Sequence, residues 1–274
     1  MQNPILAETV QQIENTLGEG LNQLTVERAV LGLFFSGVKL SNGSGGLCFT
    51  PLKAIPEAVC CPSSAQAMPL SGKLTQRTVC QYLDDLYHEN ALRKTLAIAT
   101  LNALSAACWQ VQPPKNYALN VGKDAFDEAV LPKKGKTVVV GALVPILRRL
   151  IKEKCDFKVL EMDKNTLKGQ ELKYYAPAED AHKYVPNADL LVITGVTLLN
   201  DTLPNLLAMA KPNAEIIVTG PTASGLPEAF FKRGVSVLGG VLVTKPDEVL
   251  NIISEGGSGY HFFGKSAERL IIKK

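Results

Sequence analysis

From residue 136 onward, apolar runs alternate with stretches whose apolar residues recur three and four positions apart. Polar residues do not interrupt the runs at every second position, which is typical of parallel strands buried on both faces. Strands are expected over 136–141, 157–163, 189–194, 214–220 and 234–240, and helices over 143–154 and from Thr202, Pro227 and Pro246. Right-handed crossovers between such strands predict a doubly wound, Rossmann-like parallel sheet in an α/β fold.

The beginning of the chain follows a different order, with strands before helices. We expect an amphipathic helix over Asn3–Leu17, then two β-rich runs around "SNGSGG", which would form a hairpin or a longer glycine loop. A proline-broken loop over 51–72 precedes helical spacing throughout 75–109. This order predicts an α+β domain over 1–112, followed through the linker "QPPKNY" by the Rossmann-like domain over 113–274.

Two copies of one short pattern, "VITGVT" and "IVTGPT", end two consecutive predicted strands. Ligands of open parallel sheets bind at this edge, where glycine admits a close approach and threonine offers a hydroxyl. Asn200, Asp201 and Thr202 then provide N-cap residue types for the next helix, whose free N–H groups favour an anionic or carbonyl group. Turning the chain and capping helices is the alternative role for all of these residues.

The turn after the first strand of the C-terminal domain is not a standard dinucleotide loop. Gly141 is present, but the other glycines of GxGxxG are missing and Pro145 enters the helix early. Glu161 nevertheless lies 20 residues after Gly141, where an acid usually binds ribose hydroxyls. Asp163 competes for this role, and a simply solvated carboxylate is the alternative, so a nucleoside-like ligand is only weakly indicated.

A glycine-rich segment near the C-terminus, "SEGGSGYHFFGKSAERL", carries Glu255 and His261. It would close over a site, with His261 as a general base; a helix exit followed by a partly packed histidine is the alternative. In the N-terminal domain, "SNGSGGLCFTP" is best suited to reach across, through Asn42, Ser44, Gly45 and Gly46.

Charge and hydropathy exclude several classes of protein. The chain has 29 basic and 26 acidic residues, a balance that does not suggest a nucleic-acid partner or an acidic membrane surface. It has no apolar run of about 18 residues, and its beginning lacks the regions of a signal peptide, so we expect a cytoplasmic protein. The final "IIKK" is expected to be a solvated basic tail.

The cysteines do not indicate a metal site or a disulfide framework. No CxxC pair occurs, and the spacing suits reduced thiols. Cys60 and Cys61 are adjacent and are expected to be incidental, because neighbouring cysteines do not easily chelate one ion tetrahedrally. The six cysteines are residues 48, 60, 61, 80, 108 and 155.

Four segments, "ADLLVITGVTLLNDTL", "IIVTGPTASGLPEAF", "VLGGVLVTKPDEVL" and "SEGGSG", together resemble the Rossmann-like domain of the putative heavy-metal chelation family. The N-terminal half, with "GGLCFTP" and "LAIATLNALS", is similar to the enolase N-terminal-like domain that precedes it in that family. The resemblance implies a site in an interdomain cleft, with the ligand-binding positions Thr194, Gly195, Thr197, Asn200, Thr202, Gly220, Pro221 and Thr222, and Asn102 as a weaker choice.

The resemblance also implies partial similarity to Rossmann-like methyltransferases and a role near metal uptake or in making metal-chelating, pterin-like or flavin-like molecules. The glycine-rich methyltransferase loop is not reproduced around Gly141.

Two hypotheses of function follow. The first is an enzyme that performs condensation, hydrolysis or group transfer on a pterin-, flavin- or siderophore-like metabolite linked to heavy-metal chelation, with Glu161, Glu255 or His261 moving protons. The second is a non-catalytic binding protein for a metal chelate or a metal-bearing cofactor. Under both hypotheses we expect a small-molecule ligand as the partner, and neither a nucleic acid nor a membrane. The chain is also a candidate homodimer. No particular cofactor and no direct metal ligands are indicated.

Overall fold

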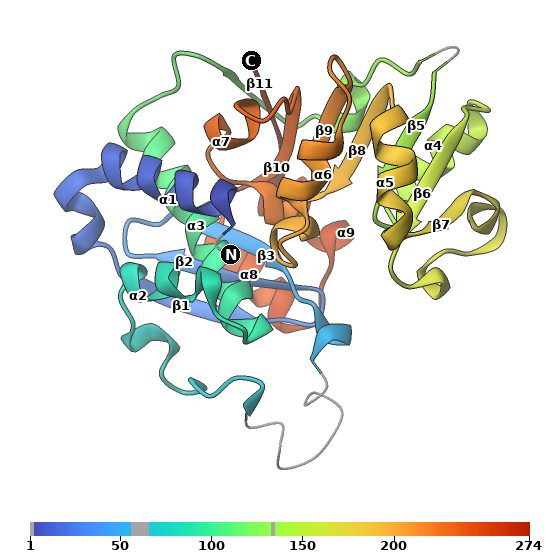
Figure 1. The fold of residues 1–274 in the computed structure, drawn as a ribbon. Helices are drawn as coiled ribbons and strands as arrows, with labels where there is room; N and C mark the ends of the chain where they lie inside the picture. The colour runs from blue at the N-terminus through green and yellow to red at the C-terminus, as the bar shows by residue number, and fades with distance from the viewer. Residues whose placement is uncertain (1–2, 56–65, 133–134) are drawn as a thin grey trace.

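Two β-sheets organise the chain in the computed structural model, which describes residues 3–55, 66–132 and 135–274 (Figure 1). The smaller sheet is antiparallel, in the order β1-β2-β3, and the larger has eight strands in the order β4-β11-β10-β9-β8-β5-β6-β7. The strands are β1 (Val26–Leu31), β2 (Phe35–Leu40), β3 (Gly45–Phe49), β4 (Ala118–Val121), β5 (Thr137–Val140), β6 (Phe157–Glu161), β7 (Tyr175–Pro177), β8 (Leu190–Thr194), β9 (Glu215–Thr219), β10 (Val237–Val243) and β11 (Ala267–Lys273).

Nine α-helices accompany these strands in the described ranges. Helix α1 begins at Pro4 because the side chain of Asn3 accepts the N–H groups of Ile5 and Leu6, which confirms the expected start. The helices are α1 (Pro4–Leu17), α2 (Val79–Asp84), α3 (Ala91–Val111), α4 (Val144–Lys152), α5 (Ala181–Tyr184), α6 (Leu203–Met209), α7 (Glu228–Phe231), α8 (Pro246–Ser254) and α9 (Gly259–Phe262).

The larger sheet contains six parallel strands in the order β7-β6-β5-β8-β9-β10. This is the doubly wound order 3-2-1-4-5-6 of Rossmann folds, and the predicted α/β class is confirmed. Successive residues of a strand point to opposite faces of the sheet. Val139 and Val192 pack in the hydrophobic cluster that contains residues of α4, whereas Val138 and Ile193 pack in the cluster that contains residues of α6. Both faces are buried, which explains why the strands read as unbroken apolar runs.

Three details differ from the sequence expectations. The first β-rich run is two strands, β1 and β2, which turn at Gly32–Phe34. The helical stretch 75–109 is two helices, because the chain leaves the helix before Asn90 and restarts where that side chain caps the Arg93 N–H. The final "IIKK" is not a solvated tail. Its isoleucines are buried in β11, which pairs antiparallel with β10 and places β4 at the sheet edge.

The smaller sheet lies between α3 and α8, a helix that comes from the other end of the chain. On the α3 side the approach is very close: a Cβ atom at Gly46 would lie 2.1 Å from the Ala99 oxygen and 2.5 Å from the Ala103 nitrogen. One buried apolar cluster runs from α1 and α3 into β5 and β8. The division into two domains at residue 112 stays a prediction, because this core is shared.

A buried ion cluster fixes the junction between α2 and α3. Asp85 is 2% exposed and binds the guanidinium groups of Arg77 and Arg93. Burial pushes the pKa of the Asp85 carboxyl upward, but the hydrogen bonds from Arg93 and Arg77 outweigh it and hold that pKa below its ordinary value. Ionised Asp85 therefore stabilises the fold.

This cluster predicts a pH dependence of stability. Since the folded-state pKa lies below the unfolded one, the contribution is complete above about pH 4 and is lost as pH falls through the folded-state pKa. Asp85→Asn should cost about 2 kcal/mol at pH 7, because the hydrogen bonds from two guanidinium groups lose their charged acceptor. Urea unfolding at pH 7 and pH 3 should show the gap between wild type and variant narrowing at the lower pH. A gap that stays constant would contradict the assignment.

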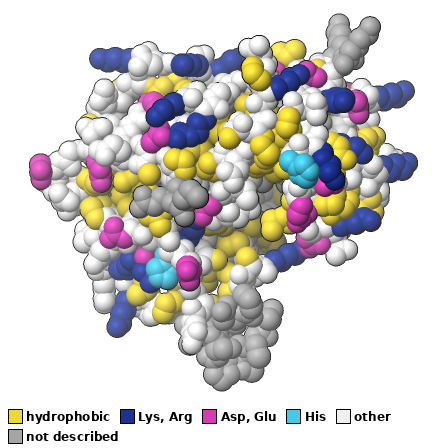
Figure 2. Space-filling model, in the orientation of Figure 1, with side chains coloured by type: hydrophobic (Ala, Val, Ile, Leu, Met, Phe, Trp, Pro, Cys, Tyr) yellow, Lys and Arg dark blue, Asp and Glu magenta, His cyan; other side chains and the backbone are white. Residues whose placement is uncertain are grey.

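Surface charge is mixed on the face shown in Figure 2, where basic and acidic side chains are interspersed rather than gathered in one area. Among the helices of the described residues, none combines the length and the apolar character that crossing a membrane requires.

Candidate functional site

The reversal of strand order between β5 and β8 gives the candidate site its place. The chain winds outward in opposite directions from these two strands, and in doubly wound sheets such a reversal is the place where a ligand crevice forms at the carboxyl edge. Gly141 follows β5 with a φ of +95°, and a Cβ atom there would lie 2.7 Å from Cγ2 of Thr194, which ends β8. A side chain at residue 141 would be strained by this φ and would overlap Thr194, so the turn after β5 requires glycine.

The corner after β9 lies directly beside the corner after β8. Thr194 and Thr219 pair in parallel register. Gly195 is buried, and a Cβ atom on it would lie 2.9 Å from the backbone nitrogen of Ala223. The two corners therefore form one continuous rim, at which Thr194 and Gly220 remain partly exposed.

The loop after β8 extends along this rim toward the end of β6. The Asn200 side chain uses its oxygen to accept from the Thr202 N–H at 3.3 Å and the Thr202 hydroxyl at 2.7 Å. Its amide nitrogen faces only the sulfur of exposed Met162, at 4.0 Å. The exposed Asn200 amide N–H groups therefore lie beside the residue that follows β6 and have no oxygen acceptor among the described residues. Thr197 is buried, and its hydroxyl donates to the Thr194 carbonyl at 2.7 Å.

One acidic residue from the sequence analysis lies at the same edge. Glu161 ends β6, and one of its carboxylate oxygens accepts from the N–H groups of Met162 and Asp163. Asp163 is instead paired with Lys53 at 2.6 Å, and the hydrogen bond from this lysine is the main cause of a lowered Asp163 pKa. The sequence analysis missed Lys53 and Met162. Nothing near Lys53 in the sequence signals that it would meet the end of β6.

Thr222 and Asn102 have structural roles in place of the expected ligand contacts. Strand β3 is an edge strand, so its outward backbone groups need other partners. The Thr222 hydroxyl accepts from the Phe49 N–H at 3.1 Å. The Asn102 amide donates to the carbonyl groups of Leu47, Pro221 and Thr222 at 2.9, 3.2 and 3.1 Å. Both side chains are buried and connect the two sheets.

Ser44 and Gly45 are also buried, and they do not line a cleft. A Cβ atom at Gly45 would lie 2.6 Å from Cγ1 of Val243 and 3.2 Å from Cβ of Pro246. Gly45 and Gly46 therefore serve close packing between β3 and its neighbours β10 and α3, whereas Gly43 supplies a turn with a φ of +83°.

Glu255 and His261 do not join the rim through any contact of the described residues. Both are exposed. The Nδ1 atom of His261 lies 3.0 Å from the Ser258 N–H, which it accepts, so the ring caps its own helix α9. The three candidates for proton transfer are therefore not brought together, and only Glu161 lies at the crevice.

No group of three or more His, Cys, Asp or Glu side chains arranged for a metal ion occurs in 3–55, 66–132 and 135–274. Cys60 and Cys61 lie outside the described residues. Burial raises the pKa of the Cys48 thiol to about 12 and does the same for Cys108, so both stay protonated.

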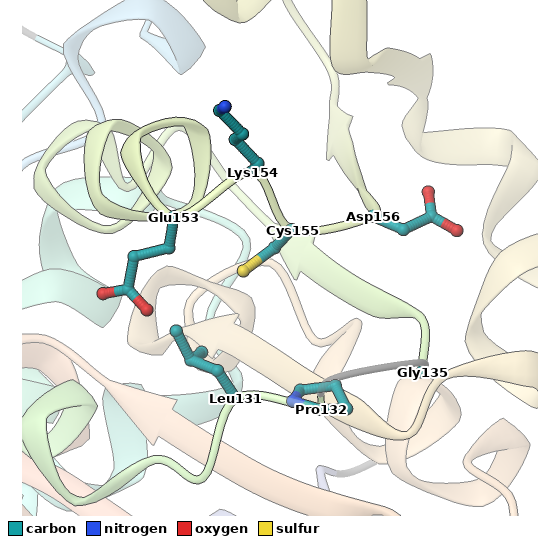
Figure 3. A pocket seen from close by; sticks show the side chains of 7 residues that line it. All are labelled: Leu131, Pro132, Gly135, Glu153, Lys154, Cys155 and Asp156. Carbon is teal, nitrogen blue, oxygen red and sulfur yellow. The ribbon is translucent and has the colours of Figure 1, made fainter.

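A cavity of about 410 Å³ lies at the opposite edge of the sheet, where β6 begins. Leu131 and Cys155 point toward each other there, whereas Lys154 points away (Figure 3). Because ligands of doubly wound sheets bind at the carboxyl ends of the strands, this cavity is not part of the candidate site.

Comparisons with known proteins agree along most of the chain. Two family models, both described as "Putative heavy-metal chelation", match residues 14–105 and 124–272. An uncharacterized protein of Methanocaldococcus jannaschii is 35% identical over 181 residues, which are 64% of this chain and 64% of that protein. The chain thus spans less than two thirds of the length of this relative.

Two solved structures of proteins with unknown function share the fold. The one from Pyrococcus horikoshii has a TM-score of 0.77 at 19% identity and covers 98% of this chain and 100% of its own. The one from Desulfitobacterium hafniense has a TM-score of 0.69 at 22% identity, with 96% and 99% covered.

Proposed function

Because the chain belongs to the family described as "Putative heavy-metal chelation", we propose that it binds a metal-chelating metabolite through the organic part of that molecule. The site is the crevice between the loops after β5 and β8, and the ligand presents a carbonyl or anionic group to it. The observation that carries this proposal is the reversal of strand order at β5 and β8, with Gly141, Thr194 and Asn200 around it.

The groups at the crevice suit an organic acceptor better than a bare heavy-metal ion. Asn200 offers amide N–H groups, and the Thr194 hydroxyl, whose oxygen accepts the Val196 N–H at 3.4 Å, keeps its proton to donate. Hydroxyl and amide groups recognise carbonyl and carboxylate oxygens, whereas soft metal ions prefer thiolate or imidazole. Exposed Met162 adds an adaptable apolar wall for a flat ring. Pterins and flavins combine such rings with carbonyl groups.

A catalytic role is a second candidate, favoured by the place of Glu161. Its carboxylate lies at the end of β6, next to Met162, which Asn200 touches. A bound metabolite at the crevice would meet this acid, which would then move a proton in a condensation, hydrolysis or group transfer. For this role, turnover must fall in Glu161→Gln while ligand binding persists.

The binding site is tested by Asn200→Asp. This change keeps the oxygen that accepts from Thr202 but replaces the amide donor with a negative acceptor, so a carbonyl or anionic ligand should lose about tenfold or more in affinity. A thermal-shift panel of pterins, flavins, nucleosides and S-adenosylmethionine identifies the ligand class, and calorimetry gives its Kd.

The matched control is Asn205→Asp, which makes the same charge change at an exposed position of α6. Its Kd should equal that of the wild type. If Asn200→Asp binds every ligand of the panel as tightly as the wild type does, the crevice is not the site.

A further inference from the structure

A second cavity, of about 230 Å³, lies away from the crevice, where α1 and the end of α3 meet the start of α7. Gln12 lines it from α1, Trp109 and Gln112 from the end of α3, and Tyr117 from the following linker. Glu228, the first residue of α7, closes it. None of the residues assigned to the crevice between β5 and β8 lines this cavity.

Glu228 brings to this cavity a carboxylate that has no cationic partner among the described residues. Its Oε2 atom is buried and has no hydrogen-bond partner, and no lysine or arginine of the described ranges lies within ion-pair distance of it. The neighbouring residues of α7 illustrate the contrast, because Lys232 and Arg233 both bind Glu8 on α1. A partly buried carboxylate without a cationic neighbour binds an incoming cationic donor more strongly than an exposed and paired carboxylate does.

Two aromatic side chains form a fixed wall beside this carboxylate. The Trp109 indole N–H donates to the Tyr117 hydroxyl oxygen at 2.9 Å, and the Tyr117 ring packs edge-on against Phe231. Burial raises the pKa of Tyr117 to about 12; the Trp109 hydrogen bond opposes this shift, and the negative charge of Glu228 and a hydrogen bond with its carboxylate add to it. The phenol therefore stays neutral, and its proton faces the Glu228 carboxylate. Aromatic walls with a carboxylate are the combination that recognises organic cations.

We propose that this cavity binds a small organic cation that carries a primary ammonium or guanidinium group. The cation donates to Glu228 and lies against Trp109 and Tyr117, while Gln12 and Gln112 contact the rest of the molecule. Sites for drug-sized ligands occupy about 300–1,000 Å³, so 230 Å³ suits a smaller molecule such as a short alkyl amine. Lys115 also lines the cavity, and its own ammonium group is the competitor for Glu228.

The chain supplies its own reporter for this test, because Trp109 is its single tryptophan. Titration with putrescine and with agmatine should change the tryptophan emission and reach saturation, and the two arms distinguish an ammonium from a guanidinium ligand. Butanediol, which has the length of putrescine without its charges, should cause no saturable change. The absence of a saturable change with both amines, in the wild type and in Lys115→Met, would overturn the proposal.

Variants then assign the binding to this cavity. Glu228→Gln keeps the shape but removes the charge, and should weaken amine binding at least about tenfold. Glu14→Gln, on the exposed face of α1, makes the same change as a control and should have no effect. Lys115→Met should bind amines as tightly as the wild type or more tightly.

Full affinity in Glu228→Gln would show that the amines bind elsewhere. If that variant does not fold, as judged by circular dichroism, unchanged or improved binding in Lys115→Met combined with lost binding in Trp109→Leu, both measured by calorimetry, decides instead. Amine binding that persists in Asn200→Asp separates this proposal from the one for the crevice.

Discussion

Replacing Gly46 by alanine is expected to destabilise the protein by about 3 kcal/mol or more, the upper end of the usual cost of overpacking. The added methyl group would lie 2.1 Å from the Ala99 oxygen and 2.5 Å from the Ala103 nitrogen. Both are backbone atoms in the middle of a buried helix, so no side chain can rotate away to make room. Either β3 or α3 must move, and the contacts of the smaller sheet are lost. Urea unfolding followed by circular dichroism measures this cost.

Gly20→Ala provides the matched control. That glycine lies in an exposed turn with a φ outside the left-handed region, and a Cβ atom added to it would have no neighbour within 4 Å. The same substitution should change stability there by less than about 1 kcal/mol. Equal effects at the two positions would show that β3 and α3 are not in close contact.

Asn102→Leu is the second change with a large expected effect, about 3 kcal/mol of lost stability. The leucine has a similar volume, but the carbonyl groups of Leu47, Pro221 and Thr222 lose their shared donor in a buried place. Each unsatisfied buried carbonyl costs about 1–3 kcal/mol, and Pro221 keeps the Ser224 hydroxyl as a second donor. Thermal and urea unfolding measure the loss.

Thr100→Val on the same helix is the control for this change. Thr100 is fully buried, but its hydroxyl bonds only to the Leu96 carbonyl within the helix. This nearly isosteric variant should lose about 1 kcal/mol or less. If Asn102→Leu is no less stable than Thr100→Val, the amide does not hold the two sheets together. Limited proteolysis of Asn102→Leu should also show faster cleavage between the sheets than in the control.

The parallel strands could be predicted because both of their faces are covered. Val138 to Val140 and Leu190 to Ile193 are apolar on each side, which no half-exposed strand would tolerate. Strand β11 was not predicted because Lys273 at its end and Lys274 after it resemble a basic tail, and only the pairing with β10 buries Ile271 and Ile272. The break before α3 was missed because Asn90 interrupts no apolar spacing.

The candidate site could be predicted only in part. The strand ends at Thr194 and Gly220 follow from the repeated motif, because parallel strands place their carboxyl ends at one edge. Partners that come from another part of the chain could not be predicted. Asn102, Gly45 and Thr222 have the composition of a ligand site, yet here hydroxyl, amide and glycine serve the backbone of an edge strand. Sequence patterns do not distinguish these uses, since both call for the same small polar groups.

The contact of β3 with Thr222 has a consequence for synthesis on the ribosome. The Phe49 N–H donates to the Thr222 hydroxyl, which is translated 173 residues later. At about 5–20 residues per second, translation takes roughly 10–35 seconds to cover that distance. During this interval the nascent strand has an open side that can pair with other chains. We therefore expect ribosome-bound chains that end before Thr222 to associate with chaperones, and those that extend past α8 to be released from them.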